Sequence, residues 1–172
     1  MNDENIFSHR LNMTPKYLIC DLDQTLVDVS EFCYHCAKHQ RIIIEGLFYY
    51  VHIRPYTREL IEHCLRKNIE IIIYSANDLI YIDSIVKILF ESFSKPSKIM
   101  TKKDMVLDSA GGYYVKTLIS VGIKYNLNRK DLLAIDDNLD NYPNDSNVIY
   151  IKPWVKEMTN DTELLKIIDI LQ

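Results

Sequence analysis

Short apolar runs alternate along this chain with segments of helical periodicity, and this alternation constrains the fold more than any other feature. The runs are continuous rather than alternating in polarity, which is typical of strands buried on both faces of a parallel sheet. They lie at residues 17–20, 69–74, 131–137 and 147–151. Amphipathic helical segments lie at residues 54–68, 77–93 and 161–172. We therefore predict an α/β fold, a three-layer α/β/α sandwich with a central, mostly parallel sheet.

Two further segments complete the expected architecture. The stretch "RIIIEGLFYYVHI", residues 41–53, reads as a β-hairpin because two β-branched or aromatic runs flank Glu45-Gly46, a pair suited to a turn. We expect this hairpin to be a small insert. Residues 115–126, "VKTLISVGIKYN", fit either a helix or a broken strand.

The length and net charge of the chain exclude several classes of protein. A chain of 172 residues favours one domain, here residues 16–172 after a polar lead-in at residues 1–15. The net charge of −4 argues against direct nucleic-acid binding, and no apolar run is long enough to span a membrane. Without a secretory signal, we expect an intracellular protein with free thiols in a reducing compartment, nuclear or cytoplasmic. The Ile- and Asn-rich composition suggests an AT-rich genome such as that of a virus or a parasite. The oligomeric state stays open.

Polar residues follow three of the predicted strands. Asp21, Ser75 and Asp136 each stand where an apolar run ends. Ligands of parallel sheets bind outside the carboxyl ends of the strands, so these residues should converge on one crevice. Asp21 and Asp23 lie two residues apart and should point to the same side, where mutual repulsion raises one pKa.

Such a pair suits an ionised nucleophile beside a group that carries a proton. Adding Asp136-Asp137 makes a cluster of hard oxygen ligands of the kind Mg²⁺ prefers, and Mg²⁺ would bring a phosphoryl group. Each feature has a plainer reading when taken alone. Asp136-Asp137 resembles a turn and helix cap, Ser75 a loop hydroxyl, and Lys116 a surface lysine.

Taken in order, these segments resemble a known family. "DLDQTLV" is similar to the first motif of the haloacid dehalogenase (HAD) superfamily of phosphotransferases. The hairpin, Arg-Pro and following helix resemble the small phosphatase branch that acts on the C-terminal domain of RNA polymerase II, the NLI-interacting-factor-like domain. The resemblance continues to the C-terminus through three more segments, "IIIYSANDLIYIDSIVKIL", "GGYYVKTLISVG" and "LLAIDDNLDNYPND".

The resemblance implies a Mg²⁺-dependent protein serine/threonine phosphatase with a HAD-like, Rossmann-type fold and no large cap domain. Asp21 would be the nucleophile that forms an aspartyl-phosphate, and Asp23 the general acid and then base. The phosphate would be bound by Thr25, Ser75, Ala76 and Lys116. The metal would be bound by Asp21, Asp136, Asp137 and the backbone carbonyl of Asp23. The partner would be a phosphorylated protein segment such as the RNA polymerase II tail.

Two residues differ from the usual motifs of this phosphatase branch, so the sequence does not identify the substrate. Gln24 stands where Glu is usual, and Asp137 where Asn is frequent, which changes the charge available to metal and phosphate. Two alternatives remain: a HAD phosphatase for a small molecule or nucleic-acid end, and a catalytically silent phosphopeptide-binding module.

A zinc site is a further alternative. In the stretch "CYHCAKH", Cys33 and Cys36 form a Cys-x-x-Cys pair, which is half of a zinc site, and His39, His63 or Cys64 could supply further ligands. Because a clean second pair of ligands is missing, we favour packing or solvent-side roles for these residues.

Overall fold

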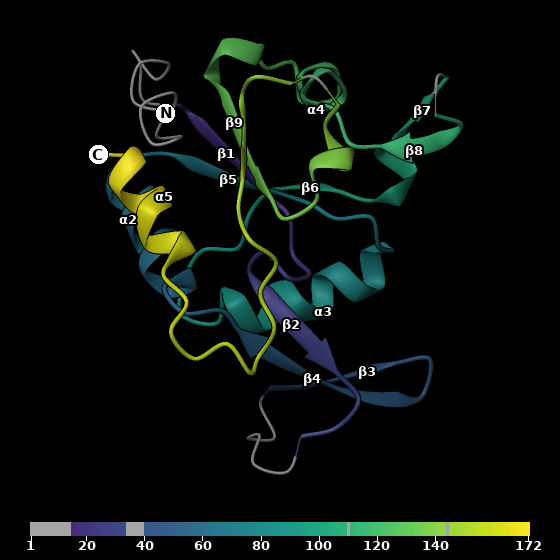
Figure 1. Cartoon of the computed structure of the whole chain (residues 1–172), viewed down its shortest axis with the longest axis vertical. Helices are drawn as coiled ribbons and strands as arrows, with labels where there is room; N and C mark the ends of the chain where they lie inside the picture. The colour runs from purple at the N-terminus through teal and green to yellow at the C-terminus, as the bar shows by residue number, and fades with distance from the viewer. Residues whose placement is uncertain (1–14, 34–39, 110, 144) are drawn as a thin grey trace, which may run out of the picture.

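A five-stranded parallel sheet forms the centre of the molecule, in the order β10-β9-β1-β5-β6 (Figure 1). The computed structural model describes residues 15–33, 40–109, 111–143 and 145–172. The strands of this sheet are β1 (Tyr17–Cys20), β5 (Glu70–Tyr74), β6 (Lys98–Met100), β9 (Leu132–Asp136) and β10 (Val148–Tyr150). The predicted α/β class and the parallel sheet are confirmed.

Helices cover both faces of this sheet. They are α2 (Thr57–Arg66), α3 (Leu79–Leu89), α4 (Leu118–Tyr125) and α5 (Glu163–Ile170). Side chains alternate along β1, so Leu18 and Cys20 share a buried cluster with α2, α3 and α5, whereas Ile19 joins a second cluster with α4. The layers are therefore helix, sheet and helix, and their interfaces form the two hydrophobic cores.

The segment at residues 115–126 resolves into the end of a strand and a helix. Val115 ends β8, and α4 begins after Thr117, whose side chain accepts a hydrogen bond from the backbone N–H of Ser120. The helix ends at Asn126, which has a left-handed backbone conformation (φ 55°). Short 3₁₀ helices in the described connections are η2 (Lys102–Asp104), η3 (Arg129–Asp131) and η4 (Leu139–Asn141).

Two small antiparallel sheets lie outside the central one. The first has the order β2-β4-β3 and includes the predicted hairpin; its strands are β2 (Val27–Ser30), β3 (Arg41–Ile44) and β4 (Leu47–Ile53). The second pairs β7 (Val106–Asp108) with β8 (Tyr113–Val115). The sequence did not predict β2, β6, β7 or β8, because these short strands lie beside polar or turn residues and form no continuous apolar run of their own.

The cysteines only partly follow the expectation of free thiols. Cys20 and Cys64 are buried and free, but Cys33 is disulfide-bonded, so the expectation is wrong there. A disulfide sulfur is not available as a thiolate ligand, and Cys36 and His39 lie outside the described residues. No helix in the described part of the chain is long and apolar enough to cross a membrane.

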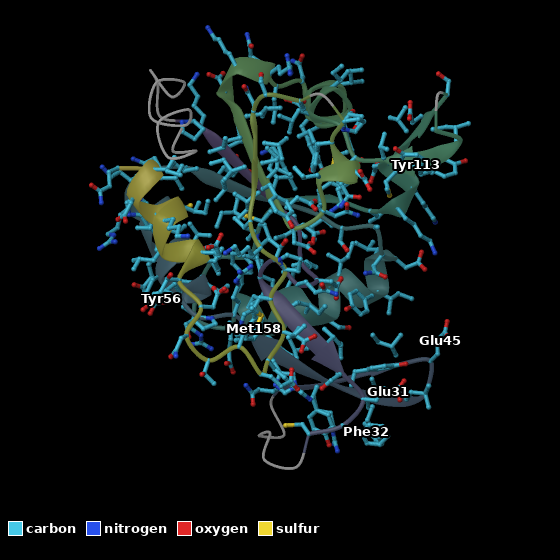
Figure 2. The ribbon with its side chains drawn as sticks, viewed as in Figure 1. Glu31, Phe32, Glu45, Tyr56, Tyr113 and Met158 are labelled. Carbon is cyan, nitrogen blue, oxygen red and sulfur yellow. The ribbon has the colours of Figure 1, made fainter. Side chains whose placement is uncertain are left out.

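The turn of the β3–β4 hairpin gives a test of this fold. Glu45 and Gly46 both have positive φ angles, 51° and 81°, and Glu45 lies at the tip of the hairpin (Figure 2). Asn-Gly is the preferred pair for such a turn, whereas Glu is strained there. We expect Glu45→Asn to raise the free energy of unfolding by about 0.5 kcal/mol and Gly46→Ala to lower it by about 1 kcal/mol, measured by urea denaturation. Destabilisation by Glu45→Asn would contradict the turn assignment.

Candidate active site

The candidate site lies at the carboxyl ends of three neighbouring strands. Asp21 directly follows β1, Ser75 follows β5, and Asp136 ends β9. From β1 the chain proceeds to β5 and β6 on one side, and then crosses to β9 on the other (Figure 1). This reversal beside β1 is a topological switch point, where open α/β sheets bind their ligands. The structure thus brings the polar strand ends together as expected.

A buried lysine lies between the carboxylates of Asp21 and Asp136. The ammonium of Lys116 donates hydrogen bonds to Asp21 Oδ1 at 2.5 Å and to Asp136 Oδ2 at 2.7 Å. The side chain of Lys116 is only 1% exposed. Its ammonium also lies 5.8 Å from the centroid of the Tyr74 ring. The segment between β8 and α4 therefore inserts one cation between residues from two parallel strands.

Burial and this ion triad determine the protonation of the site. Burial raises the pKa of Asp21 to about 7, although the Lys116 cation opposes the shift. Burial lowers the pKa of Lys116, but Asp21 and Asp136 more than offset this effect, and the net pKa is raised. The ammonium consequently stays charged at neutral pH.

The carboxylates of Asp21, Asp136 and Asp137 form the acidic cluster of the site. One oxygen of each lies within 4.8 Å of the others. Carboxylate oxygens are the ligands that Mg²⁺ prefers in proteins, so the donor type fits a small hard cation.

Neighbouring side chains orient this cluster. Asp136 Oδ1 accepts hydrogen bonds of 2.9 Å from the backbone N–H of Asn138 and from Asn141 Nδ2. Thr25 Oγ1 donates to Asp137 Oδ1 at 3.1 Å. The threonine of the first motif is therefore buried against the acidic cluster, which links the loop after β1 to the loop after β9.

Asp23 has a different environment from Asp21. Its Oδ1 accepts a hydrogen bond from the Tyr81 hydroxyl, and its Oδ2 accepts one of 2.9 Å from Asn77 Nδ2. Burial raises the pKa of Asp23, although these two bonds oppose the shift. Burial is the largest cause of the raised pKa of both carboxylates, and the charge of Asp23 adds to the rise at Asp21, in the direction predicted from their spacing.

From the sequence we predict no site role for Tyr81, and Asn77 or Asp78 only as the cap of the helix, which begins after Asp78. Asn77 lies just before the N-cap Asp78, and Tyr81 lies in the first turn of α3, so the start of this helix supplies both donors to Asp23. Asn77 also connects Asp23 to the strand end after β5, since its Nδ2 lies 3.4 Å from Ser75 Oγ. Ser75 is buried, whereas the neighbouring Ala76 is exposed.

A buried arginine holds the backbone of the loop after β1. Arg54 Nη1 donates to the carbonyls of Gln24 and Thr25, each at 3.1 Å. Its Nε and Nη2 bind the two oxygens of Asp161 at 2.8 and 2.7 Å, and Nη2 also binds the Lys152 carbonyl. Gln24 has a left-handed conformation (φ 59°), which costs energy for a residue other than glycine. The hydrogen bonds from Arg54 help to stabilise this conformation. The sequence analysis did not identify this role of Arg54.

The sequence of the chain also matches a known family. The sequence profile of the NLI interacting factor-like phosphatases matches residues 16–172. The chain belongs to this family. Among curated protein sequences, none matches the chain significantly.

Solved structures share the fold of this family member at low identity. Fcp1, an essential RNA polymerase II CTD phosphatase, matches with a TM-score of 0.61 and 19% identity over 88% of this chain. Fission yeast Fcp1 bound to beryllium fluoride gives 0.59 and 20% over 88%. The chain spans only 45% and 44% of those two chains.

A more distant enzyme matches over almost the whole chain. The 3-deoxy-D-manno-octulosonate 8-phosphate phosphatase of Moraxella catarrhalis, in complex with magnesium, phosphate and KDO, has a TM-score of 0.55 and 10% identity. The match covers 99% of this chain and 91% of that enzyme. Together these structures identify the HAD phosphatase fold.

Removing the buried cation tests the ion triad. We expect Lys116→Met to lower the free energy of unfolding by about 3 kcal/mol at pH 8, because Asp21 and Asp136 are then buried without a partner. The deficit should shrink as the pH falls. Unpaired buried carboxylates have raised pKa values, so the folded variant binds protons more readily than the unfolded chain.

Urea denaturation of both proteins between pH 5 and pH 8 measures this effect. Adding Asp21→Asn to Lys116→Met should restore part of the stability, because one buried charge is removed. A deficit that does not change with pH would contradict the assignment.

Proposed function

We propose that this chain is a Mg²⁺-dependent phosphatase that acts on phosphoserine or phosphothreonine in a protein segment, through an aspartyl-phosphate intermediate. One observation carries the proposal. Asp21 is buried against a cation and an acidic cluster, whereas Asp23, two residues later, is held separately by neutral donors. Two carboxylates in unlike environments suit a nucleophile and an acid–base group.

In the first proposed step, a carboxylate oxygen of Asp21 attacks the phosphorus and the bond to the serine oxygen breaks. Asp23 gives its proton to that leaving oxygen, so serine departs as the neutral alcohol. Burial raises the pKa of Asp23, which favours the proton-carrying form that this step requires. Lys116 offsets negative charge on Asp21 and on the phosphoryl oxygens as the dianion approaches.

In the second proposed step, water attacks the phosphorus of the aspartyl-phosphate, and the Asp23 carboxylate takes the proton from this water. Asp21 is released as the carboxylate and inorganic phosphate leaves. The hydroxyl of Ser75 and the backbone around Ala76 lie at the adjacent strand end, where they would bind phosphoryl oxygens.

The acidic cluster would hold Mg²⁺ through Asp21, Asp136, Asp137 and the backbone carbonyl of Asp23. Bound there, Mg²⁺ would supply positive charge that offsets repulsion between the carboxylates and the phosphate. Thr25 and Asn141 keep their partner carboxylates oriented for this role.

A protein segment is favoured as the substrate because Asp23 is partly exposed and also lines a cavity of about 300 Å³. This volume is at the lower end for ligand pockets and suits one side chain of an extended segment. The phosphorylated RNA polymerase II tail is a first peptide to test, since Fcp1 is a CTD phosphatase. We propose no direct contact with nucleic acid.

Asp21→Asn tests the nucleophile. We expect the wild-type protein to hydrolyse nitrophenyl phosphate and a phosphoserine peptide only with Mg²⁺, and Asp21→Asn to lower kcat at least about 10³-fold. Asp169→Asn, an exposed position on α5, is the control with the same charge change. Full activity in EDTA or in Asp21→Asn would refute the mechanism. Turnover of sugar or nucleotide phosphates but of no phosphopeptide would refute the protein substrate.

Tyr81→Phe tests the positioning of Asp23. The serine leaving group needs a proton, whereas nitrophenolate does not, so misplacing Asp23 should affect the peptide more. We expect kcat to fall about 10-fold for a phosphoserine peptide and less than about 2-fold for nitrophenyl phosphate. The control is Tyr150→Phe on β10. Equal losses on both substrates would mean that Tyr81 supports only the fold.

A further inference from the structure

Tyr74 is a buried aromatic residue beside the candidate active site, and the proposed mechanism gives it no role. It is the last residue of β5, directly before Ser75, and it is fully buried. Its side chain belongs to the core cluster that packs against α4 and includes Leu118. Lys116 stands two residues before Leu118, so the connection that carries the lysine passes along the same side of the sheet.

Contacts with three other elements hold the Tyr74 ring. Its hydroxyl donates a hydrogen bond of 2.9 Å to the Asp104 carbonyl in η2 and lies 3.4 Å from Ser120 Oγ in α4. The ring of Tyr142 lies perpendicular to it, with the centroids 6.3 Å apart and an interplanar angle of 90°. The Tyr74 ring therefore cannot turn without breaking contacts at its hydroxyl and with its aromatic neighbour.

The ammonium of Lys116 lies over the ring of Tyr74, 5.8 Å from the centroid. The face of an aromatic ring attracts a cation within about 6 Å, and the attraction is stronger where water is excluded. Both side chains are almost completely buried. The ring therefore adds a third attraction to those of the two carboxylates that bind this ammonium.

The hydrogen bonds of Lys116 leave one donor for a ligand. An ammonium has three N–H donors, and two of them bind Asp21 Oδ1 and Asp136 Oδ2. Within the described ranges of the chain, no residue accepts the third. Lysine has a flexible four-carbon stem, so its neighbours must determine where this donor lies.

Tyr142 connects the Tyr74 ring to the acidic cluster. It directly follows η4, in the loop that begins at the end of β9. The residue before it, Asn141, donates a hydrogen bond to Asp136 Oδ1. The loop that orients this carboxylate therefore also packs against the ring that faces the lysine.

We propose that Tyr74 is a positioning residue for Lys116, whose ring holds the ammonium between Asp21 and Asp136 with one N–H donor left for a phosphoryl oxygen. This inference rests on the proposed function, because it gives the third donor a phosphate ester as its ligand. A cation that is fixed before the substrate arrives needs no reorganisation as charge develops in the transition state. Tyr74 itself touches neither the substrate nor the reacting atoms in this proposal.

A double-mutant cycle on unfolding tests the contact without requiring turnover. Urea denaturation at pH 8 compares the wild-type chain, Tyr74→Leu, Lys116→Met and the double variant. Tyr74→Leu removes the same ring volume in both backgrounds, so the cost of the cavity cancels in the cycle. We expect the folding equilibrium constant to fall about 10-fold more when Lys116 is present than when Met replaces it.

Two further variants separate the ring from other effects. Tyr74→Phe keeps the ring, so its coupling to Lys116→Met should be about 2-fold or less. Tyr125→Leu is the matched control, because the Tyr125 ring lies 5.5 Å from the Lys124 ammonium and its hydroxyl donates to the Ile99 carbonyl at 2.7 Å. It should show no coupling to Lys116→Met. Should Tyr74→Leu not fold, Tyr74→Met replaces it, since methionine fills irregular spaces.

Hydrolysis of nitrophenyl phosphate gives a second measurement. Tyr74→Leu should lower kcat about 10-fold in the presence of Lys116 and less than about 2-fold in the Lys116→Met background. Tyr74→Phe should recover at least about half of the wild-type kcat, because the ring face is restored. Thermal unfolding establishes that each variant is folded.

The outcomes separate this inference from the proposed function. Equal losses of stability in the two backgrounds overturn the inference, because Tyr74 then supports only the fold. A loss of kcat that persists in the Lys116→Met background, or that is equal for the Leu and Phe variants, also overturns it. Coupling in unfolding without hydrolysis of any phosphate ester supports the positioning assignment and overturns the proposed activity.

Discussion

The buried ammonium of Lys116 stabilises the carboxylates around which the site is built. Lys116 lies between Asp21 and Asp136, which end adjacent strands of the central sheet and are themselves almost fully buried. Two carboxylates in such a place would otherwise become protonated or destabilise the fold. The register of β1 against β9 brings Asp21 beside Asp136, and the β8–α4 connection inserts Lys116 between them. The triad therefore depends on both features together.

Asp21 and Asp23, two neighbouring carboxyl groups of the site, have different environments. Asp21 pairs with a cation, whereas Asp23 receives hydrogen bonds from a phenol and an amide and remains partly exposed. The β-strand directs both residues to the carboxyl edge of the sheet, but tertiary contacts from α3 distinguish them. Specialisation of two identical side chains therefore arises from their partners rather than from their spacing.

Local pattern predicted the parallel sheet and placed Asp21 and Asp136 at its edge, because buried strands have a clear apolar signature. It could not select Lys116, which stands after a three-residue strand and was identified only through family resemblance. The roles of Tyr81 and Arg54 depend on contacts between segments far apart in sequence, 58 residues for the Tyr81–Asp23 bond, so no local signal contained them. Cys33 differs from expectation for a similar reason, since disulfide bonding is a property of the folded chain.

Arg54 has a consequence for how the protein matures. Its guanidinium connects the carbonyls of the loop after β1 to Lys152 and Asp161, near the other end of the chain. During synthesis, at about 5–20 residues per second, the first strand and its aspartates emerge long before these partners. Lys152 and Asp161 can hold the Arg54 guanidinium only after they have left the ribosome. The final support of this edge of the sheet is therefore added late in synthesis.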